Sequence, residues 1–178
     1  MFILTIILWI LLGILIVLII LALIVPRTYH VERSIIINKP LPEVFAYIKK
    51  VKNQDDWSPW KKRDPGMKQT FTGTDGTVGF ISKWESDHKH VGHGEQEIIN
   101  IEENKVMESE LRFLKPFKSQ STGFLQTDTE GEKTKVTWGF YGKHKIPLNV
   151  MMLFYNMDKA VGKDFEEGLL DLKTVLEK

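Results

Sequence analysis

The stretch GKDFEEGLLDLKTVLE, residues 162–177, decides the fold, because it ends the chain in an amphipathic helix. Its apolar residues return every three or four positions, which is the spacing of one face of an α-helix. The same spacing extends back toward Pro147 and Asn149, which are expected to open this helix. The predicted stripe consists of Val150, Phe154, Met157, Val161, Phe165, Leu169, Leu172 and Leu176. A long helix with one apolar face needs a broad apolar surface to cover.

Residues 69–142 are predicted to provide that surface as a β-sheet. Apolar and polar residues alternate along them, which is the pattern of strands with one buried face. Turn-rich segments divide them into six strand-like runs, at 69–72, 77–86, 94–101, 105–114, 119–127 and 135–142. A further run at 31–38 and a short amphipathic helix from Pro42 precede them, followed by an irregular loop or very short helix at 55–68. Short connections predict an antiparallel sheet. The fold class is therefore α+β: a curved antiparallel sheet of about seven strands around a long C-terminal helix.

The N-terminal segment has a different composition from the rest of the chain. None of the 24 Lys and Arg or 23 Asp and Glu residues falls within residues 1–26. Twenty-five helical residues span about 37 Å, enough to cross a bilayer core of about 30 Å. A cleaved signal peptide is the alternative, but no basic residue precedes the apolar run and no small-residue cleavage site follows it.

These features predict a transmembrane helix at 1–25, a short linker at 26–30 and a soluble domain at 31–178. Arg27, Arg33 and Lys39 follow the predicted membrane helix, and the positive-inside rule then places the domain in the cytoplasm.

Overall composition excludes several classes of function. The formal net charge of +1 provides no overall positive electrostatic field that would attract nucleic acid. The chain has no cysteine, which excludes disulfide scaffolds, thiolate metal sites, iron–sulfur clusters and cysteine nucleophiles. No glycine-rich phosphate loop or serine nucleophile elbow is present, so no catalytic residue, metal or other cofactor is predicted.

Large aromatic side chains on inward strand faces suggest a hydrophobic ligand pocket. They alternate with Ser and Met, which would add a few polar or adaptable contacts. The alternative is an ordinary solid core, which the spacing alone does not distinguish from a pocket. The candidate ligand-binding residues are Trp57, Trp60, Phe80, Trp84, Leu111, Phe113, Trp138, Phe140, Phe154 and Met157.

Two other groups of residues invite a chemical interpretation. His88, His90 and His93 resemble a metal cluster, but they lie where a hairpin tip is expected. Carboxylates at alternate strand positions, such as Glu95 with Glu97, favour the solvated side of a sheet, with Arg112 forming a cross-strand salt bridge. If one of Glu95, Glu97, Glu108 or Asp56 turned inward, it could act as an acid or base.

Several strings, in this order, resemble one known family. They are PLPEVFAYI (40–48), DWSPWKKRDPGMK (56–68), GHGEQEIINIEENKVMESELRFLKPFKS (92–119), KVTWGFYG (135–142) and the terminal GKDFEEGLLDLKTVLE. Over about residues 31–178 the chain resembles the START-like helix-grip superfamily, also called SRPBCC, in its polyketide cyclase/dehydrase and lipid transport branch. The resemblance implies a hydrophobic cavity between sheet and helix, but it transfers no particular reaction.

The sequence therefore predicts a membrane-anchored binding protein whose partners are a hydrophobic small molecule or lipid and the membrane. A cyclase- or hydrolase-type enzyme acting on an apolar substrate is the second hypothesis. A cell-envelope module that binds another protein is the third, and an exposed apolar patch would distinguish it.

Overall fold

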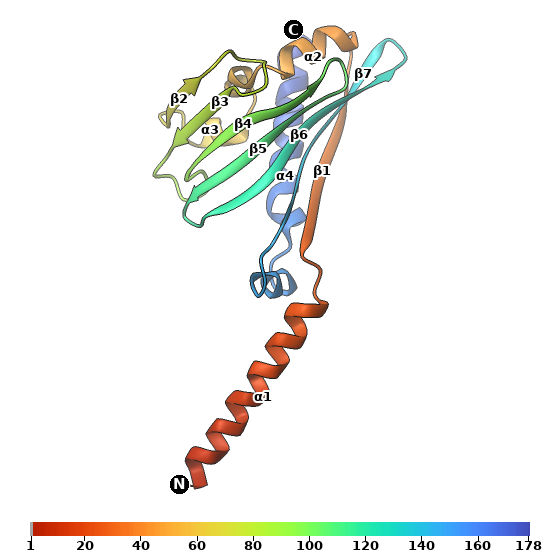
Figure 1. Ribbon diagram of the computed structural model, residues 1–178. Helices are drawn as coiled ribbons and strands as arrows, with labels where there is room; N and C mark the ends of the chain where they lie inside the picture. The colour runs from red at the N-terminus through yellow and green to blue at the C-terminus, as the bar shows by residue number, and fades with distance from the viewer. Residues whose placement is uncertain (1) are drawn as a thin grey trace.

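The computed structural model describes residues 2–178 and shows one helix leading into a single curved sheet with helices on its inner side (Figure 1). The strands are β1 (Thr28–Ile37), β2 (Lys68–Thr72), β3 (Ile81–Glu85), β4 (His93–Glu102), β5 (Val106–Lys115), β6 (Ser119–Glu130) and β7 (Lys133–Lys143). The helices are α1 (Phe2–Ile24), α2 (Leu41–Ile48), η1 (Val51–Asp56), α3 (Pro59–Arg63), η2 (Leu148–Leu153) and α4 (Met157–Leu176).

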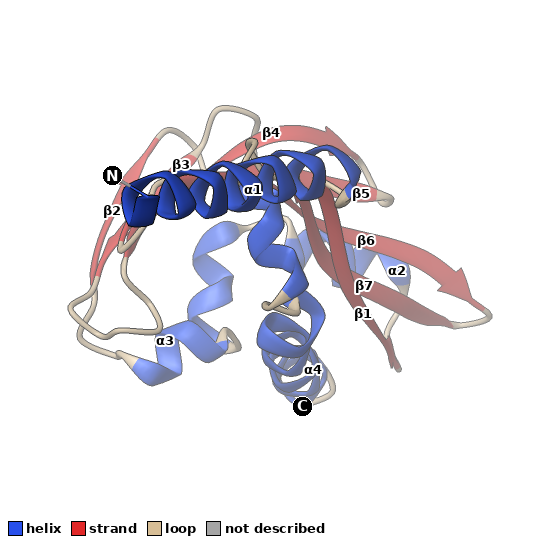
Figure 2. Cartoon of the chain, turned by 90° about the horizontal axis from the view of Figure 1, so that it is seen from below, coloured by secondary structure: helices blue, strands red, loops and turns tan. Residues whose placement is uncertain are grey.

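Within residues 2–178, the seven strands form one sheet in the order β1-β7-β6-β5-β4-β3-β2. All six neighbouring pairs are antiparallel, which confirms the predicted sheet. Only the pairing of β1 with β7 joins strands far apart in sequence, and α4 lies against these two strands. Seen from below, the sheet arches over α3 and α4 (Figure 2). The α+β fold predicted from the sequence is therefore confirmed.

The core lies where α4 meets the sheet. Phe165, Leu169 and Leu172 of α4 are buried, as are Val136 and Trp138 of β7. These positions follow the predicted helical stripe and the predicted inward face of the last strand. The helical and strand periodicities of the sequence therefore identified the face of α4 and the face of β7 that pack against each other.

One predicted element was wrong. The expected continuous helix from Pro147 is instead η2 followed by α4, which begins only at Met157. Asn156 interrupts it with an extended backbone, and its side-chain oxygen accepts a hydrogen bond from Lys159 N at 2.9 Å. This cap starts a new helix, although apolar residues at helical spacing continue across the break. Phe154 consequently lies outside the helix and is 89% exposed.

Several strand boundaries also differ from the expectation, and the largest differences are at the starts of β1 and β3 and at the end of β6, which extends to Glu130. β1 begins at Thr28, so residues 28–30 of the predicted linker belong to the sheet. β3 begins at Ile81, and the first residues of the predicted run at 77–86 form a turn instead.

Helix α1 projects away from the domain (Figure 1). Its apolar window has a mean hydropathy of 3.5 and is 6% buried, so by length and composition the helix is able to cross a membrane. Such a helix is compatible with an anchor or with a signal sequence.

Candidate functional site

Four of the ten predicted ligand-binding residues belong to a packed aromatic cluster. Trp138 of β7 is its centre, with ring centroids 4.7 Å from Trp57, 5.5 Å from Trp60 and 4.5 Å from Phe165 of α4. Phe140 contacts Phe165 at 5.7 Å. Trp57 is fully buried and Trp138 is 8% exposed. Close ring contacts at these distances, three of them edge to face and the contact of Trp138 with Phe165 tilted, are typical of a solid core.

Phe80 also lies in the core. It is 1% exposed, and its ring stacks on that of Phe71, with centroids 6.0 Å apart. Its position just before β3 places it at the buried end of the inner sheet face.

A second aromatic group lies on the inner face of β3, β4 and β5 and is less deeply buried. Trp84 and Phe113 meet edge to face at 6.1 Å, and Leu111 lies two residues from Phe113 on the same face. All three side chains are partly buried. We call Trp84, Leu111 and Phe113 the inner wall.

Two glycines allow the inner wall to lie flat on the sheet. A Cβ atom at Gly94 would stand 2.4 Å from Cζ2 of Trp84, and one at Gly123 would stand 3.0 Å from Cδ1 of Leu111. The side chains therefore cover glycine backbone instead of projecting from it. The inner wall therefore packs closely against the backbone of β4 and β6.

Polar groups border the inner wall, as the alternation of Ser with large aromatic residues predicted, but Tyr29, Gln96 and Ser121 were not among the candidates. Gln96 Nε2 donates a hydrogen bond to Ser109 Oγ at 3.1 Å, and the hydroxyl groups of Tyr29 and Ser121 are 2.7 Å apart. Their signal in the sequence is their position, because each occupies an inward-facing register position. Such groups can orient a mostly apolar ligand.

The two remaining candidates lie elsewhere. Phe154 and Met157 line an open hollow of about 470 Å³ beside the first residues of β1, together with Tyr29. A second hollow of about 600 Å³ lies at the other end of the domain, between Leu41 and the Gly131 turn. The predicted residues thus divide into a core, an inner wall and a rim.

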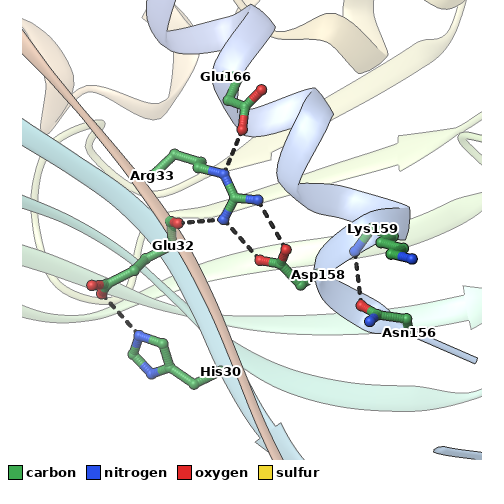
Figure 3. Close-up of polar contacts among 7 residues, drawn as sticks. All are labelled: His30, Glu32, Arg33, Asn156, Asp158, Lys159 and Glu166. Atoms are coloured by element: carbon green, nitrogen blue, oxygen red, sulfur yellow. Dashed lines mark hydrogen bonds and ion pairs between the residues drawn. The ribbon is translucent and has the colours of Figure 1, made fainter.

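An ion cluster fixes α4 to the edge of the sheet (Figure 3). Arg33 of β1 donates to both carboxylate oxygens of Asp158 at 2.8 and 3.0 Å, to Glu166 at 2.6 Å and to the carbonyl of Glu32 at 2.8 Å. A Cβ atom at Gly162 would stand 2.2 Å from the Arg33 guanidinium, which therefore lies directly across the helix. The hydrogen bonds from Arg33 lower the pKa of Asp158.

The alternating carboxylates lie on the opposite face from the inner wall. Arg112 donates to Glu95 at 2.6 Å and to Glu97 at 2.7 Å, and it also contacts Glu110. Glu95 and Arg112 are register partners, so the predicted cross-strand salt bridge is confirmed.

The other two acid–base candidates also have hydrogen-bond partners. Asp56 accepts from the Tyr47 hydroxyl at 2.7 Å. Glu108, on the outer face of β5, accepts from Asn100 Nδ2 at 3.0 Å and from the Tyr141 hydroxyl at 3.3 Å. Neither carboxylate lies on the inner wall.

The hydrogen bond from Arg112 lowers the pKa of Glu95, with a smaller contribution from Lys83. A group with a lowered folded-state pKa stabilises the fold above its ordinary pKa, and this contribution is lost as the pH falls through the folded-state value. We therefore expect Arg112→Gln to raise the pKa of Glu95, measured by carboxyl NMR titration. Arg63→Gln removes an arginine from a different ion pair and serves as the control. An unchanged Glu95 titration in Arg112→Gln would contradict this assignment.

His88 and His90 lie in the turn between β3 and β4, and His93 is the first residue of β4. The rings of His88 and His90 are 5.7 Å apart. Among residues 2–178, no group of three or more His, Cys, Asp or Glu side chains has the arrangement of a metal site.

The arched antiparallel sheet closed by a long C-terminal helix defines a helix-grip protein of the Bet v 1/START-like class, and solved structures agree. Ara h 8.0201 is 12% identical with a TM-score of 0.55, covering 84% of this chain and 97% of that one. The Aha1 dimer from Colwellia psychrerythraea is 14% identical with a TM-score of 0.57, covering 84% and 96%. Major latex-like protein 151 from Panax ginseng is 15% identical with a TM-score of 0.53, covering 83% and 97%.

The sequence places the chain more narrowly within this class. The family described as polyketide cyclase/dehydrase and lipid transport matches residues 28–177, and the chain belongs to that family. Among curated protein sequences, no significant match is found.

Proposed function

We propose that this protein binds a hydrophobic small molecule or lipid against the inner wall while anchored in a membrane by α1. The observation that carries the proposal is the partial burial of Trp84, Leu111 and Phe113 on the inner sheet face. Large apolar side chains that neighbouring helices do not fully cover provide surface for an apolar ligand. The description of the family includes lipid transport, which supports the same chemistry.

The surroundings of the inner wall fit such a ligand. Gln96 and Ser109 on one side, and Tyr29 and Ser121 on the other, are hydrogen-bonded in pairs and keep unused acceptor capacity. A molecule with a long apolar body and one polar end could bury the body on the wall and place the polar end at one pair.

The deeply buried candidates have a supporting role in this proposal. Trp57, Trp138 and Phe140 form the solid layer between α4 and β7. Trp60 is partly buried at the edge of the same layer. They hold the helix against the sheet, so the proposed ligand surface includes only part of the predicted set of residues.

Membrane anchorage is the second part of the proposal. It assigns residues 1–25 to the membrane and residues 31–178, together with residues 28–30 of β1, to a binding domain in the cytoplasm. The apolar composition of α1 and the basic residues Arg27, Arg33 and Lys39 support it. β1 begins three residues after Val25, so the domain stays close to the bilayer surface.

A photoreactive lipid tests the ligand surface directly. The full-length protein in phosphatidylcholine vesicles is incubated with a diazirine-bearing palmitic acid, irradiated and analysed by peptide mass spectrometry. We expect labelling on β3 and β5, and we expect Phe113→Gln to weaken binding about 10- to 100-fold, because burying a Phe side chain is worth about 1.5–3 kcal/mol.

The adjacent residue provides a matched control. Leu114 points away from the inner wall and is 48% exposed, so Leu114→Gln makes a similar chemical change on the other face of the same strand. It should leave labelling of β3 unchanged. Equal labelling of β3 in wild type and in a folded Phe113→Gln variant would refute this binding surface.

A further inference from the structure

Helix η2 is attached to the end of α1. The side chain of Asn149 is fully buried, and its Nδ2 donates hydrogen bonds of 2.9 Å to the carbonyls of both Ala22 and Val25. Carbonyls in the last turn of a helix have no partner within the helix, so Asn149 caps α1 from outside. Figure 1 shows η2 directly beside this end of α1.

The segment around Asn149 exposes an unusual amount of apolar surface. Six side chains form what we call the η2 surface: Ile146, Leu148, Met151, Leu153, Phe154 and Tyr155. Phe154 is 89% exposed and Met151 is 62% exposed. Contiguous exposed residues of this kind mark a contact surface.

The charges beside the η2 surface have one sign. Lys143 and Lys145 precede it and are exposed. Arg27 lies in the short segment between α1 and β1. No Asp or Glu occurs from residue 143 to 157. The first carboxylate after the segment, Asp158, is bound to Arg33. Exposed lysines next to aromatic and aliphatic side chains are typical of segments that lie in a membrane interface.

We propose that the η2 surface inserts into the headgroup–acyl boundary of the bilayer that holds α1. The inference rests on the proposed membrane anchorage, because Asn149 places η2 at the end of α1, where the chain leaves the hydrocarbon core. Aromatic residues such as Phe154 and Tyr155 then lie in the interface, and the lysines contact anionic headgroups. With two contacts to the membrane, the domain has a fixed orientation on the bilayer.

This orientation connects the η2 surface with ligand exchange. The hollow beside β1 is lined by Phe154 and Met157 on one side and Tyr29 on the other. Tyr29 also contacts Ser121 at the border of the inner wall. Insertion of η2 would therefore place the hollow beside β1 at the headgroup region of the bilayer, where a lipid could pass from the membrane to the domain.

Site-specific fluorescence tests the insertion, and the absence of cysteine makes single labelling straightforward. Phe154→Cys and Met151→Cys are each labelled with a nitrobenzoxadiazole fluorophore in full-length protein. The protein is reconstituted in phosphatidylcholine–phosphatidylglycerol vesicles containing a shallow nitroxide lipid. We expect blue-shifted emission and at least about threefold stronger quenching than at a label on the far end of the domain.

Val78→Cys is the matched control, because Val78 is also apolar and 60% exposed but lies before β3, at the opposite end of that strand from the β3–β4 turn. Weak quenching at positions 151 and 154, equal to that at 78, would overturn the proposal. Protection of both labels only in native membranes, and not in lipid vesicles, would also overturn it in favour of a protein partner. Carbonate extraction of the same vesicles reports the anchor separately, so loss of insertion with α1 retained contradicts the η2 proposal alone.

Discussion

Trp138→Ala is expected to lower the free energy of unfolding by about 3–5 kcal/mol, since it empties a large volume in a close-packed core. The Trp138 ring contacts Trp57, Trp60 and Phe165, which come from three different helical segments and their borders. Its removal would leave these rings without a common partner. Urea unfolding of the full-length protein in detergent, followed by circular dichroism, measures the loss.

Trp84→Ala provides the same chemical change on the inner wall. Trp84 is partly buried and has one aromatic ring partner, Phe113. We expect its loss to cost about 1–2 kcal/mol, since less apolar area returns to water. A cost for Trp138→Ala no larger than that for Trp84→Ala would show that Trp138 is not part of a solid core.

The comparison of Trp138→Ala with Trp84→Ala distinguishes a residue that stabilises the core from a residue that is proposed to contact the ligand. Trp138 was a candidate binding residue because the strand period identifies which face a side chain occupies. The period does not say how deeply neighbouring helices bury that side chain, because helix placement depends on contacts distant in sequence. Trp138 and Trp84 therefore look alike in the sequence, although one is core and the other belongs to the inner wall.

Most of the fold was predictable because its local patterns agree with its tertiary contacts. Alternation predicted the strands, and the stripe through Phe165, Leu169 and Leu172 predicted the face of α4. The prediction failed at Phe154, where apolar spacing continues across the Asn156 cap. A single capping side chain overrides the pattern there, and the exposed segment that results forms the η2 surface.

The position of Arg33 on the inward face of a strand indicates that it needs an acidic partner, although no such partner was among the predictions from the sequence. It lies between Val31 and Ile35 on the inward face of β1, where a charge requires a partner. The partners are Asp158 and Glu166 on α4, more than 120 residues later in the chain. The sequence could indicate that Arg33 needs an acidic partner, but the structure was needed to identify which one.

Gly168→Leu is expected to destabilise the domain by about 2–3 kcal/mol, because α4 has no room for a side chain where it crosses Trp138. A Cβ atom at Gly168 would stand 2.6 Å from the Trp138 ring and 3.0 Å from Cδ of Pro59. Helix propensity alone favours leucine over glycine, so the measured loss understates the steric conflict. Lys163→Leu, at an exposed position of α4, adds the same side chain without a clash and should leave stability nearly unchanged.

The double variant gives the sharper result, because the two substitutions exchange volume at one contact. Trp138→Ala creates space directly against the position into which Gly168→Leu adds carbon atoms. We expect the double variant to be at least about 1 kcal/mol more stable than the sum of the single losses predicts, as neighbouring sites couple by about 0.5–3 kcal/mol. Strict additivity in urea unfolding would mean that α4 does not contact Trp138 through Gly168. Compensation would show that this glycine sets how closely the helix approaches the sheet, and therefore how much of the inner wall remains open to a ligand.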